Sequence, residues 1–175
     1  LSCVETARGQ AVALARVTDR QRRGSVFMPM HWTEAFAPSG RANPLVIGQV
    51  DPVSGQPEFK HTPARIFGYR ETWAGFCLTR QPVAQPKGSD VIWRRIPHDG
   101  AHLHEFAGRG DAEEREAVRR ALLRDAAGER LHFEDSSTQT LREAWIADGR
   151  LTHVIYFGRR LPSRHWLAAA FSVNA

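Results

Sequence analysis

The sequence contains few cysteines and no long apolar run. Its only two cysteines, Cys3 and Cys77, are far apart and form no Cys-x-x-Cys arrangement, so the chain predicts neither a disulfide framework nor a cluster site of its own. No apolar run approaches the roughly 18 residues that span a bilayer, and no secretory signal is recognisable. We therefore expect a cytoplasmic protein that does not enter a membrane.

The chain also lacks a concentration of charge of one sign. It has 24 Lys and Arg against 19 Asp and Glu, a formal net charge of +5, and the arginines are scattered along the sequence. Nucleic-acid binding, which needs a basic stripe, is not predicted, although an anionic ligand such as a phosphate is permitted. No nucleophile elbow or phosphate-binding loop is present. The sequence therefore predicts no catalytic residue and no metal ligand of its own.

The hydrophobic pattern predicts an α+β, β-rich chain of two domains. Short apolar runs at residues 1–4, 10–17, 25–29 and 62–67 predict strands in a first domain, residues 1–79, that closes as a twisted sheet or barrel. A Pro-rich connector at residues 80–90 predicts a linker. The first strand pair, residues 1–4 and 10–17, is expected to form a hairpin.

The second domain, residues 91–175, is predicted to be a small antiparallel sheet flanked by helices. Strands are expected at residues 91–96, 101–106 and 131–134, and a hairpin at residues 140–157 turns around Asp148-Gly149. Asp111 and Glu114 form a capping box before a helix, and Ser163 can cap a last helix. On the first helix, Val118 and Leu122 are expected to point inward. The arginines at positions 119, 120 and 124 are expected to point outward.

The loop between residues 24 and 60 holds the most informative side chains. A loop this long and rich in Trp, Phe and Pro is typical of a ligand site rather than of disorder. Lys60 can supply a point charge to a phosphate, Asn43 can donate and accept towards a heterocycle, and Glu58, Asp51 or Gln56 can accept from a guanine amino group. The plainer interpretations are that Asn43 and Asp51 are turn residues and Lys60 a solvated charge.

Three segments of this region carry a resemblance to a known family. The runs RGSVFMPMHW, NPLV and DPVSGQPEFK, at residues 23–32, 43–46 and 51–60, resemble the molybdopterin-dinucleotide-binding domain of the dimethyl-sulfoxide-reductase superfamily. They are most similar to bacterial assimilatory nitrate reductases, where hairpins and helices like residues 142–151 and 161–167 also recur. The resemblance implies a double-psi β-barrel, of which this chain holds the C-terminal half because the first strands are expected upstream of Leu1.

The same resemblance implies a function and a set of contacts. It implies two-electron reduction of nitrate to nitrite at a molybdenum held by bis-molybdopterin guanine dinucleotide, with a [4Fe-4S] cluster upstream of this chain. Asn43 and Lys60 match cofactor-contacting positions of the family, and Met30, His31 and Trp32 match the edge towards the cofactor. With Glu58 these are the predicted cofactor-binding residues. The fragment alone is expected neither to bind the cofactor nor to turn over.

Other functions stay open at this point. A formate dehydrogenase or another oxyanion reductase of the superfamily shares much of the loop pattern. The second domain could instead be a docking module for an electron donor, such as a ferredoxin, a flavodoxin or a flavin reductase subunit, through its Arg-rich helix, or it could be a purely structural cap. His98, His102 and His104 have ligand-like spacing but no third ligand at fixed geometry, so an exposed polar face is expected there.

Overall fold

The structure is a computed structural model that describes every residue except 84, 86–89, 159–161, 163–169 and 172–175. The chain divides into two compact units, Leu1–Arg70 and Glu71–Ala175. Both are built on antiparallel sheets, and the described residues contain one complete α-helix and two helical residues near the C-terminus, Ala170 and Phe171. The expectation of a β-rich fold with antiparallel sheets is confirmed.

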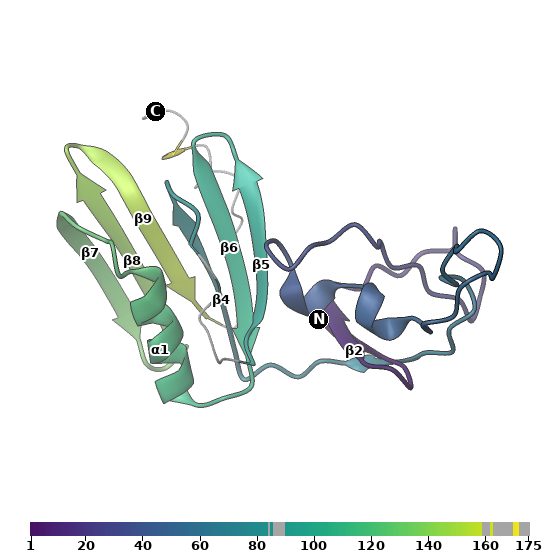
Figure 1. The fold of residues 1–175 in the computed structure, drawn as a ribbon. Helices are drawn as coiled ribbons and strands as arrows, with labels where there is room; N and C mark the ends of the chain where they lie inside the picture. The colour runs from purple at the N-terminus through teal and green to yellow at the C-terminus, as the bar shows by residue number, and fades with distance from the viewer. Residues whose placement is uncertain (84, 86–89, 159–161, 163–169, 172–175) are drawn as a thin grey trace. The chain divides into compact units, whose positions relative to one another are not determined.

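The first unit contains a three-stranded sheet of order β2-β1-β3. Its strands are β1 (Ser2–Glu5), β2 (Gln10–Ala13) and β3 (Arg65–Gly68), so the predicted hairpin of residues 1–17 is confirmed (Figure 1). Two short 3-10 helices follow β2 along the chain, η1 (Pro38–Gly40) and η2 (Asn43–Leu45). Each has a proline in its first turn, where the missing N–H costs no hydrogen bond.

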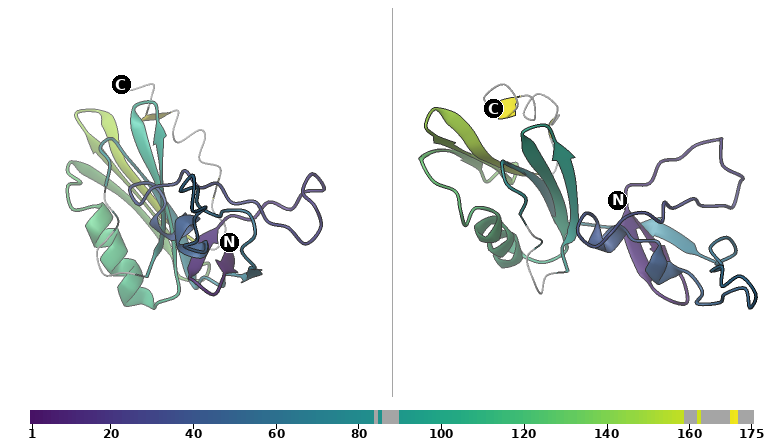
Figure 2. Two further views of the ribbon diagram at one scale, coloured as in Figure 1. Left: turned by 45° about the vertical axis from the view of Figure 1, so that its right-hand side comes forward. Right: turned by 45° about the horizontal axis from the view of Figure 1, so that its top comes forward.

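The predicted strand at residues 25–29 does not form, and this expectation was wrong. The chain after β2 leaves the sheet as a long irregular loop (Figure 2). Gly24 has a φ of +79° and Pro29 cannot donate a ladder hydrogen bond, so neither end favours an extended run. Among the described residues no strand pairs with this segment. Without a partner strand, the segment that holds Val26 and Phe27 cannot form the backbone hydrogen bonds of a sheet.

The second unit is a six-stranded antiparallel sheet of order β5-β6-β4-β9-β8-β7. Its strands are β4 (Trp73–Thr79), β5 (Ile92–His98), β6 (Ala101–Gly108), β7 (Glu129–Asp135), β8 (Thr140–Ala147) and β9 (Arg150–Phe157). The β8–β9 turn has positive φ at Asp148 (53°) and Gly149 (72°), as a tight two-residue hairpin requires. The hairpin predicted at this dipeptide is confirmed.

Helix α1 (Ala112–Leu122) lies on one side of this sheet (Figure 1). Its N-cap is Asp111, whose Oδ1 accepts from the N–H groups of Glu113 and Glu114 at 3.0 and 3.1 Å. The Glu114 side chain reaches back to the N–H of Gly110 rather than to that of the cap residue. The helix start was thus predicted correctly, with the reciprocal bond shifted by one residue.

The sheet of the second unit has a hydrophobic core on each side. On the α1 side, Val118 and Leu122 pack with a set that includes Cys77, Trp93 and Ile155. On the other side Phe76, Leu78 and Tyr156 pack with Phe171, which is fully buried. Of the predicted last helix, Ser163, Trp166 and Leu167 lie outside the described residues, whereas Ala170 and Phe171 are helical.

The boundary between the two units lies earlier in the chain than the predicted linker at residues 80–90, because β4 belongs to the sheet of the second unit. This strand pairs with β6 on one side and β9 on the other, and residues Gly75 to Thr79 are all buried. A central strand has apolar residues on both sides and lacks simple alternation. Its sequence therefore gave no sign that it belongs to the later sheet.

Candidate functional site

The segment that closes the long loop of the first unit is a small turn built around Asp51. The Asp51 Oδ1 atom accepts from the N–H of Val53 at 3.1 Å and from the N–H and hydroxyl of Ser54 at 2.7 and 2.8 Å. The hydrogen bonds from Ser54 and Val53 lower the pKa of this carboxyl. A bridge between Val50 and Pro57 closes the turn. Asp51 therefore acts as a turn residue, in agreement with the plainer interpretation.

Glu58 and Lys60 follow this turn and contact each other. The backbone N–H of Lys60 donates to Glu58 Oε1 at 2.5 Å, and His61 Nδ1 lies 3.4 Å from the same oxygen. These contacts lower the pKa of Glu58, chiefly through the Lys60 N–H. The Lys60 side chain is exposed and, among the described residues, forms no ion pair. Its ammonium group is available to an anion.

Asn43 is the first residue of η2, and its side chain is exposed. The η2 turn is held against β1 because the Thr6 hydroxyl donates to the carbonyl of Leu45 at 2.8 Å. Leu45 is buried, so it anchors the turn while Asn43 points to solvent. The side chain of Asn43 forms no hydrogen bond with any residue that the structure describes.

Met30, His31 and Trp32 lie in the irregular part of the loop. All three are exposed, with Met30 at 43% and Trp32 at 46%. No hydrogen bond or ion pair between described residues joins them to Asn43 or Lys60. The structure thus brings Glu58 and Lys60 together and leaves the other predicted contacts as separate exposed groups on one loop.

Comparison with known proteins finds a family model that is similar to the part of the chain that holds these residues. Residues 3–63 match the family model described as "Molydopterin dinucleotide binding domain". The first unit thus resembles a molybdopterin dinucleotide binding domain. All six predicted cofactor-binding residues lie inside the stretch that matches this molybdopterin domain.

One full-length relative extends the similarity beyond the molybdopterin domain. A nitrate reductase of Klebsiella oxytoca is 41% identical over 108 residues, which are 62% of this chain and 12% of that protein. The aligned stretch is longer than residues 3–63, so the similarity continues past the molybdopterin domain. No solved structure matches the chain. The resemblance to nitrate reductases that the sequence suggested is confirmed.

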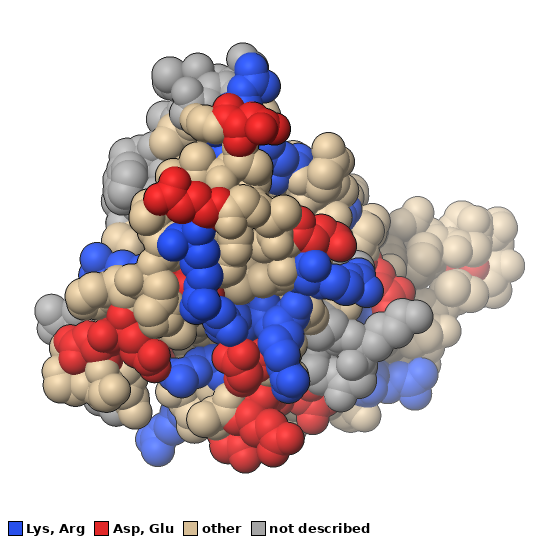
Figure 3. Space-filling view, turned by 90° about the vertical axis from the view of Figure 1, so that its left-hand side faces the viewer, with Lys and Arg blue, Asp and Glu red and all other residues tan. Residues whose placement is uncertain are grey.

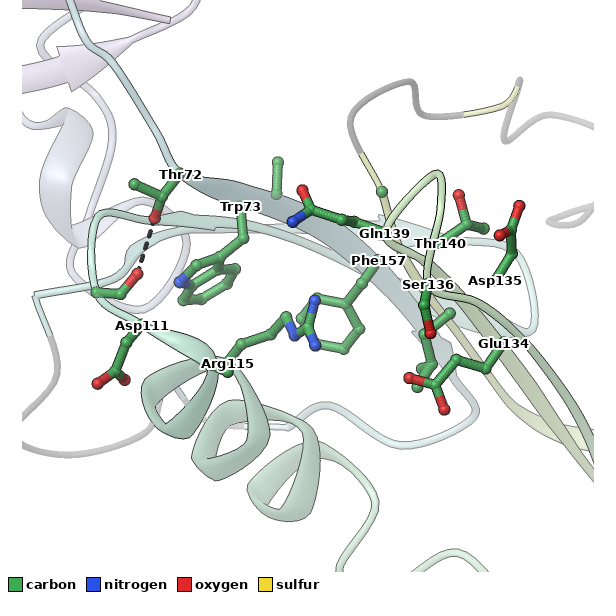
Figure 4. Close-up of a pocket in the computed structure, with 15 residues that line it drawn as sticks. Thr72, Trp73, Asp111, Arg115, Glu134, Asp135, Ser136, Gln139, Thr140 and Phe157 are labelled. Carbon is green, nitrogen blue, oxygen red and sulfur yellow. Dashed lines mark hydrogen bonds between the residues drawn. The ribbon is translucent and has the colours of Figure 1, made fainter.

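The second unit contains a cavity of about 370 Å³ between α1 and the turn that joins β7 to β8. Arg115 reaches into it from α1, with its guanidinium carbon 6.0 Å from the centre of the Phe157 ring, and Gln139 enters from the opposite side (Figure 4). Of the carboxylates around it, Asp111 caps α1 and Asp135 bonds Ser137 and Thr138 within its own turn. The cavity walls thus mix aromatic, cationic and acidic groups.

A buried carboxylate beside this cavity was missed from the sequence. Glu143 on β8 has a fully buried side chain, and its oxygens accept from Arg119 Nε and Nη2, both at 2.7 Å. Arg130 and His132 of β7 contact the same carboxylate. Burial by itself would raise the pKa of Glu143, but the hydrogen bonds from these three side chains outweigh it and lower the pKa.

The expectation that Arg119 points outward was wrong, because this side chain binds the buried carboxylate of Glu143. Its side chain is only 18% exposed because it turns back to Glu143. The signal was present in the sequence, since Leu141, Glu143 and Trp145 alternate along β8 and share a side of the sheet. A carboxylate on an apolar side needs a cationic partner from the element that covers it.

The histidines of the β5–β6 hairpin do not form an exposed polar face. His104 is fully buried, with its Nε2 atom 3.1 Å from the Thr79 hydroxyl. Burial, with smaller effects of His102 and Arg95, lowers the pKa of His104 to about 3. Among the described residues no group of three or more His, Cys, Asp and Glu could hold a metal ion. No helix in the described parts of the chain is long and apolar enough to cross a membrane.

Proposed function

We propose that this chain is the C-terminal part of a molybdenum-dependent nitrate reductase and that its first unit forms one wall of the bis-molybdopterin-guanine-dinucleotide site. The match of residues 3–63 to the molybdopterin dinucleotide domain carries this proposal. The 41% identity to a nitrate reductase supports nitrate over other substrates of the superfamily. Since that alignment covers 12% of the relative, most of the enzyme would be contributed by other segments.

The residues of the loop fit such a group. A pterin dinucleotide presents a pyrophosphate and a guanine, which need a cation and paired hydrogen-bonding groups. Lys60 is exposed and able to approach a phosphate, and Asn43 has an amide that bonds no described residue. Glu58 keeps its Oε2 atom for a guanine amino group, because the described contacts of this side chain use Oε1. The bound cofactor would supply the two-electron redox chemistry, and this chain would bind and orient it.

The incomplete sheet of the first unit supports its role as part of a larger barrel. Strand β3 is exposed along its whole length, and Ile66 and Phe67, which face opposite sides, are 47% and 37% exposed. A strand exposed on both sides is what a double-psi barrel would leave if its other strands came from elsewhere in the enzyme. The rest of the nitrate reductase chain is therefore the proposed partner of this surface.

The test uses the full-length enzyme with Lys60→Ala and Asn43→Ala. We expect each to lower the molybdenum and pterin content or the nitrate-reducing activity at least tenfold, because a contact to the cofactor is lost. Arg20→Ala, which changes an exposed cation of the segment between β2 and this loop, serves as the control and should leave both unchanged. Full activity and cofactor content in both variants would refute the proposed contacts. Formate oxidation without nitrate reduction by the parent enzyme would reassign the substrate.

A second proposed role, docking of an acidic electron donor, would use the exposed arginines of α1. Arg120 and Arg124 are exposed, whereas Arg119 is held by Glu143. Replacing both exposed arginines with Gln should weaken donor-dependent nitrate reduction at low ionic strength and leave reduction by a small-molecule dye intact. Unchanged donor kinetics would assign α1 a purely structural role.

A further inference from the structure

Strand β7 is an exposed edge of the six-stranded sheet. It pairs with β8 on one side, and no strand among the described residues pairs with its other side. Six of its seven residues are exposed. Figure 3 faces this side of the second unit, where Arg side chains are interleaved with Asp and Glu. The outer N–H and C=O groups of β7 are thus available to another strand.

This edge carries charged side chains, but it has no proline and its centre holds two exposed apolar residues. The opposite edge, β5, contains Pro97, which has no N–H to donate to a further strand. Strand β7 contains no proline, glycine or lysine. It instead exposes Leu131 and Phe133, at 51% and 52%. A seven-residue edge with two exposed apolar side chains favours association with another strand.

We propose that β7 pairs antiparallel with β7 of a second copy of this chain, about a twofold axis that passes midway between the two His132 residues. Such an axis is perpendicular to the sheet and keeps each side of the sheet in register. Leu131 and Phe133 share a side because they are two residues apart, so each Leu131 lies opposite Phe133 of the second copy. On the other side each Arg130 lies opposite Glu134 of the second copy.

The sequence of β7 is therefore self-complementary. The pairing creates two apolar pairs and two pairs of opposite charge, which are the cross-strand combinations that stabilise a sheet. Arg130 stays bound to Glu143 of its own chain but is 46% exposed, and Glu134, which is 53% exposed, can approach it from the second copy. The like charges of Glu129 and Asp135 meet only at the ends, where Asp135 is already bonded to Ser137 and Thr138.

Two charge reversals on the same strand distinguish this register. Glu134→Lys places a cation opposite Arg130 and should raise the dimer dissociation constant of the 175-residue chain at least tenfold in sedimentation equilibrium. Glu129→Lys makes the same change in net charge but places the new cation opposite Asp135. It should leave the dissociation constant unchanged or lower it. A monomeric parent chain, or equal weakening by both variants, would overturn the proposal.

Cross-linking gives a second measurement that does not depend on affinity. Residue 132 lies opposite itself, and directly opposed residues in an antiparallel pair have Cα atoms about 4.5–5.5 Å apart, within reach of a disulfide. His132→Cys should therefore form a covalent dimer under mild oxidation, and Leu131→Cys, opposite Phe133, should not. The native Cys3 and Cys77 are buried. Equal cross-linking of the two variants would exclude this register. If the chains associated through the exposed apolar residues of the first unit instead, neither variant would form a covalent dimer.

Discussion

At the scale of single residues, two buried polar side chains determine much of the behaviour of the second unit. Glu143 joins α1, β7 and β8 through one carboxylate, and His104 occupies the core between Thr79 and Trp93. Both are paired by groups from distant parts of the chain. Each affects the stability of the second unit when its charge changes, either by substitution or with pH.

Replacing Glu143 should destabilise the second unit strongly. Glu143→Gln removes the charge that balances Arg119, whose side chain is mostly buried. Breaking a buried ion pair from one side costs about 3 kcal/mol, and chemical denaturation would measure it. The control is Glu116→Gln, which removes the half-exposed partner of the same Arg119 and should cost below about 0.5 kcal/mol. Equal losses in the two variants would contradict a special role of Glu143.

His104 should make the second unit sensitive to acid. Its pKa in the folded chain is about 3, below the usual histidine value of about 6.5, so at intermediate pH the unfolded chain binds a proton that the folded chain does not. The free energy of unfolding should therefore fall as the pH drops below 6.5, by up to about 1.4 kcal/mol per pH unit from this group, until the folded pKa is reached.

The comparison for this prediction is His104→Gln. The variant should be less stable at pH 7, because Gln fits the histidine site imperfectly, yet its stability should decline less steeply between pH 6 and pH 4. Denaturant unfolding at several pH values gives both slopes. Parallel slopes for the parent and the variant would show that His104 does not control this decline.

At the scale of elements, the cap of α1 and the β8–β9 hairpin are set by local chemistry. Asp111 bonds two N–H groups of the first turn, and Asp148-Gly149 adopts the positive φ values of a tight turn. These signals act over a few residues, and the structure contains them where the sequence predicted. The segment at residues 25–29 behaves differently, since a strand needs a partner as well as an apolar pattern.

Two substitutions of Asp111 test how much the N-terminal cap of α1 stabilises the second unit. Asp111→Ala should lower the free energy of unfolding by about 1 kcal/mol, because two N–H groups of the first turn lose their acceptor. Asp111→Asn keeps an acceptor oxygen at the same position and should restore most of this loss. Urea denaturation at neutral pH would compare the two. An equal loss in both variants would mean that the charge of Asp111, and not its hydrogen bonds, stabilises the helix.

At the scale of the whole molecule, the two units differ in how much apolar surface they bury. In the first unit the buried apolar residues are Cys3, three alanines and Leu45, while large side chains such as Val17 and Phe27 are exposed. The second unit buries large side chains on both sides of its sheet. The first unit is therefore expected to depend on other segments of the enzyme for its stability, as the proposed barrel requires.

Hydrogen exchange should reveal this difference. We expect the amides of β4, β6 and β9 to be the most protected, because these central strands are covered on both sides, and those of β1 and β2 to exchange at least tenfold faster. Mass spectrometry of the 175-residue chain would measure both sets. In the full-length enzyme the β1 and β2 amides should become protected. Equal protection of the two sets in the chain alone would contradict this account.

The sequence by itself determined the local features and the resemblance to a known domain. The Asp111 cap, the Asp148-Gly149 turn, the β1–β2 hairpin and the resemblance of the loop to a molybdopterin domain all depend on residues close together in the chain. Among the predicted cofactor-binding residues, only the closeness of Glu58 and Lys60 could be expected from their spacing of two residues in the sequence. Their proposed roles depend on the resemblance.

Only the tertiary structure decided which elements lie next to one another. It placed β4 at the centre of the second sheet, turned Arg119 inward to Glu143 and buried His104 against Thr79. Each of these outcomes joins residues at least 23 positions apart, and no local pattern encodes which distant side chain will satisfy a buried charge or donor. The physical reason is that burial, and with it the need for a partner, is a property of the packed sheet and not of the strand.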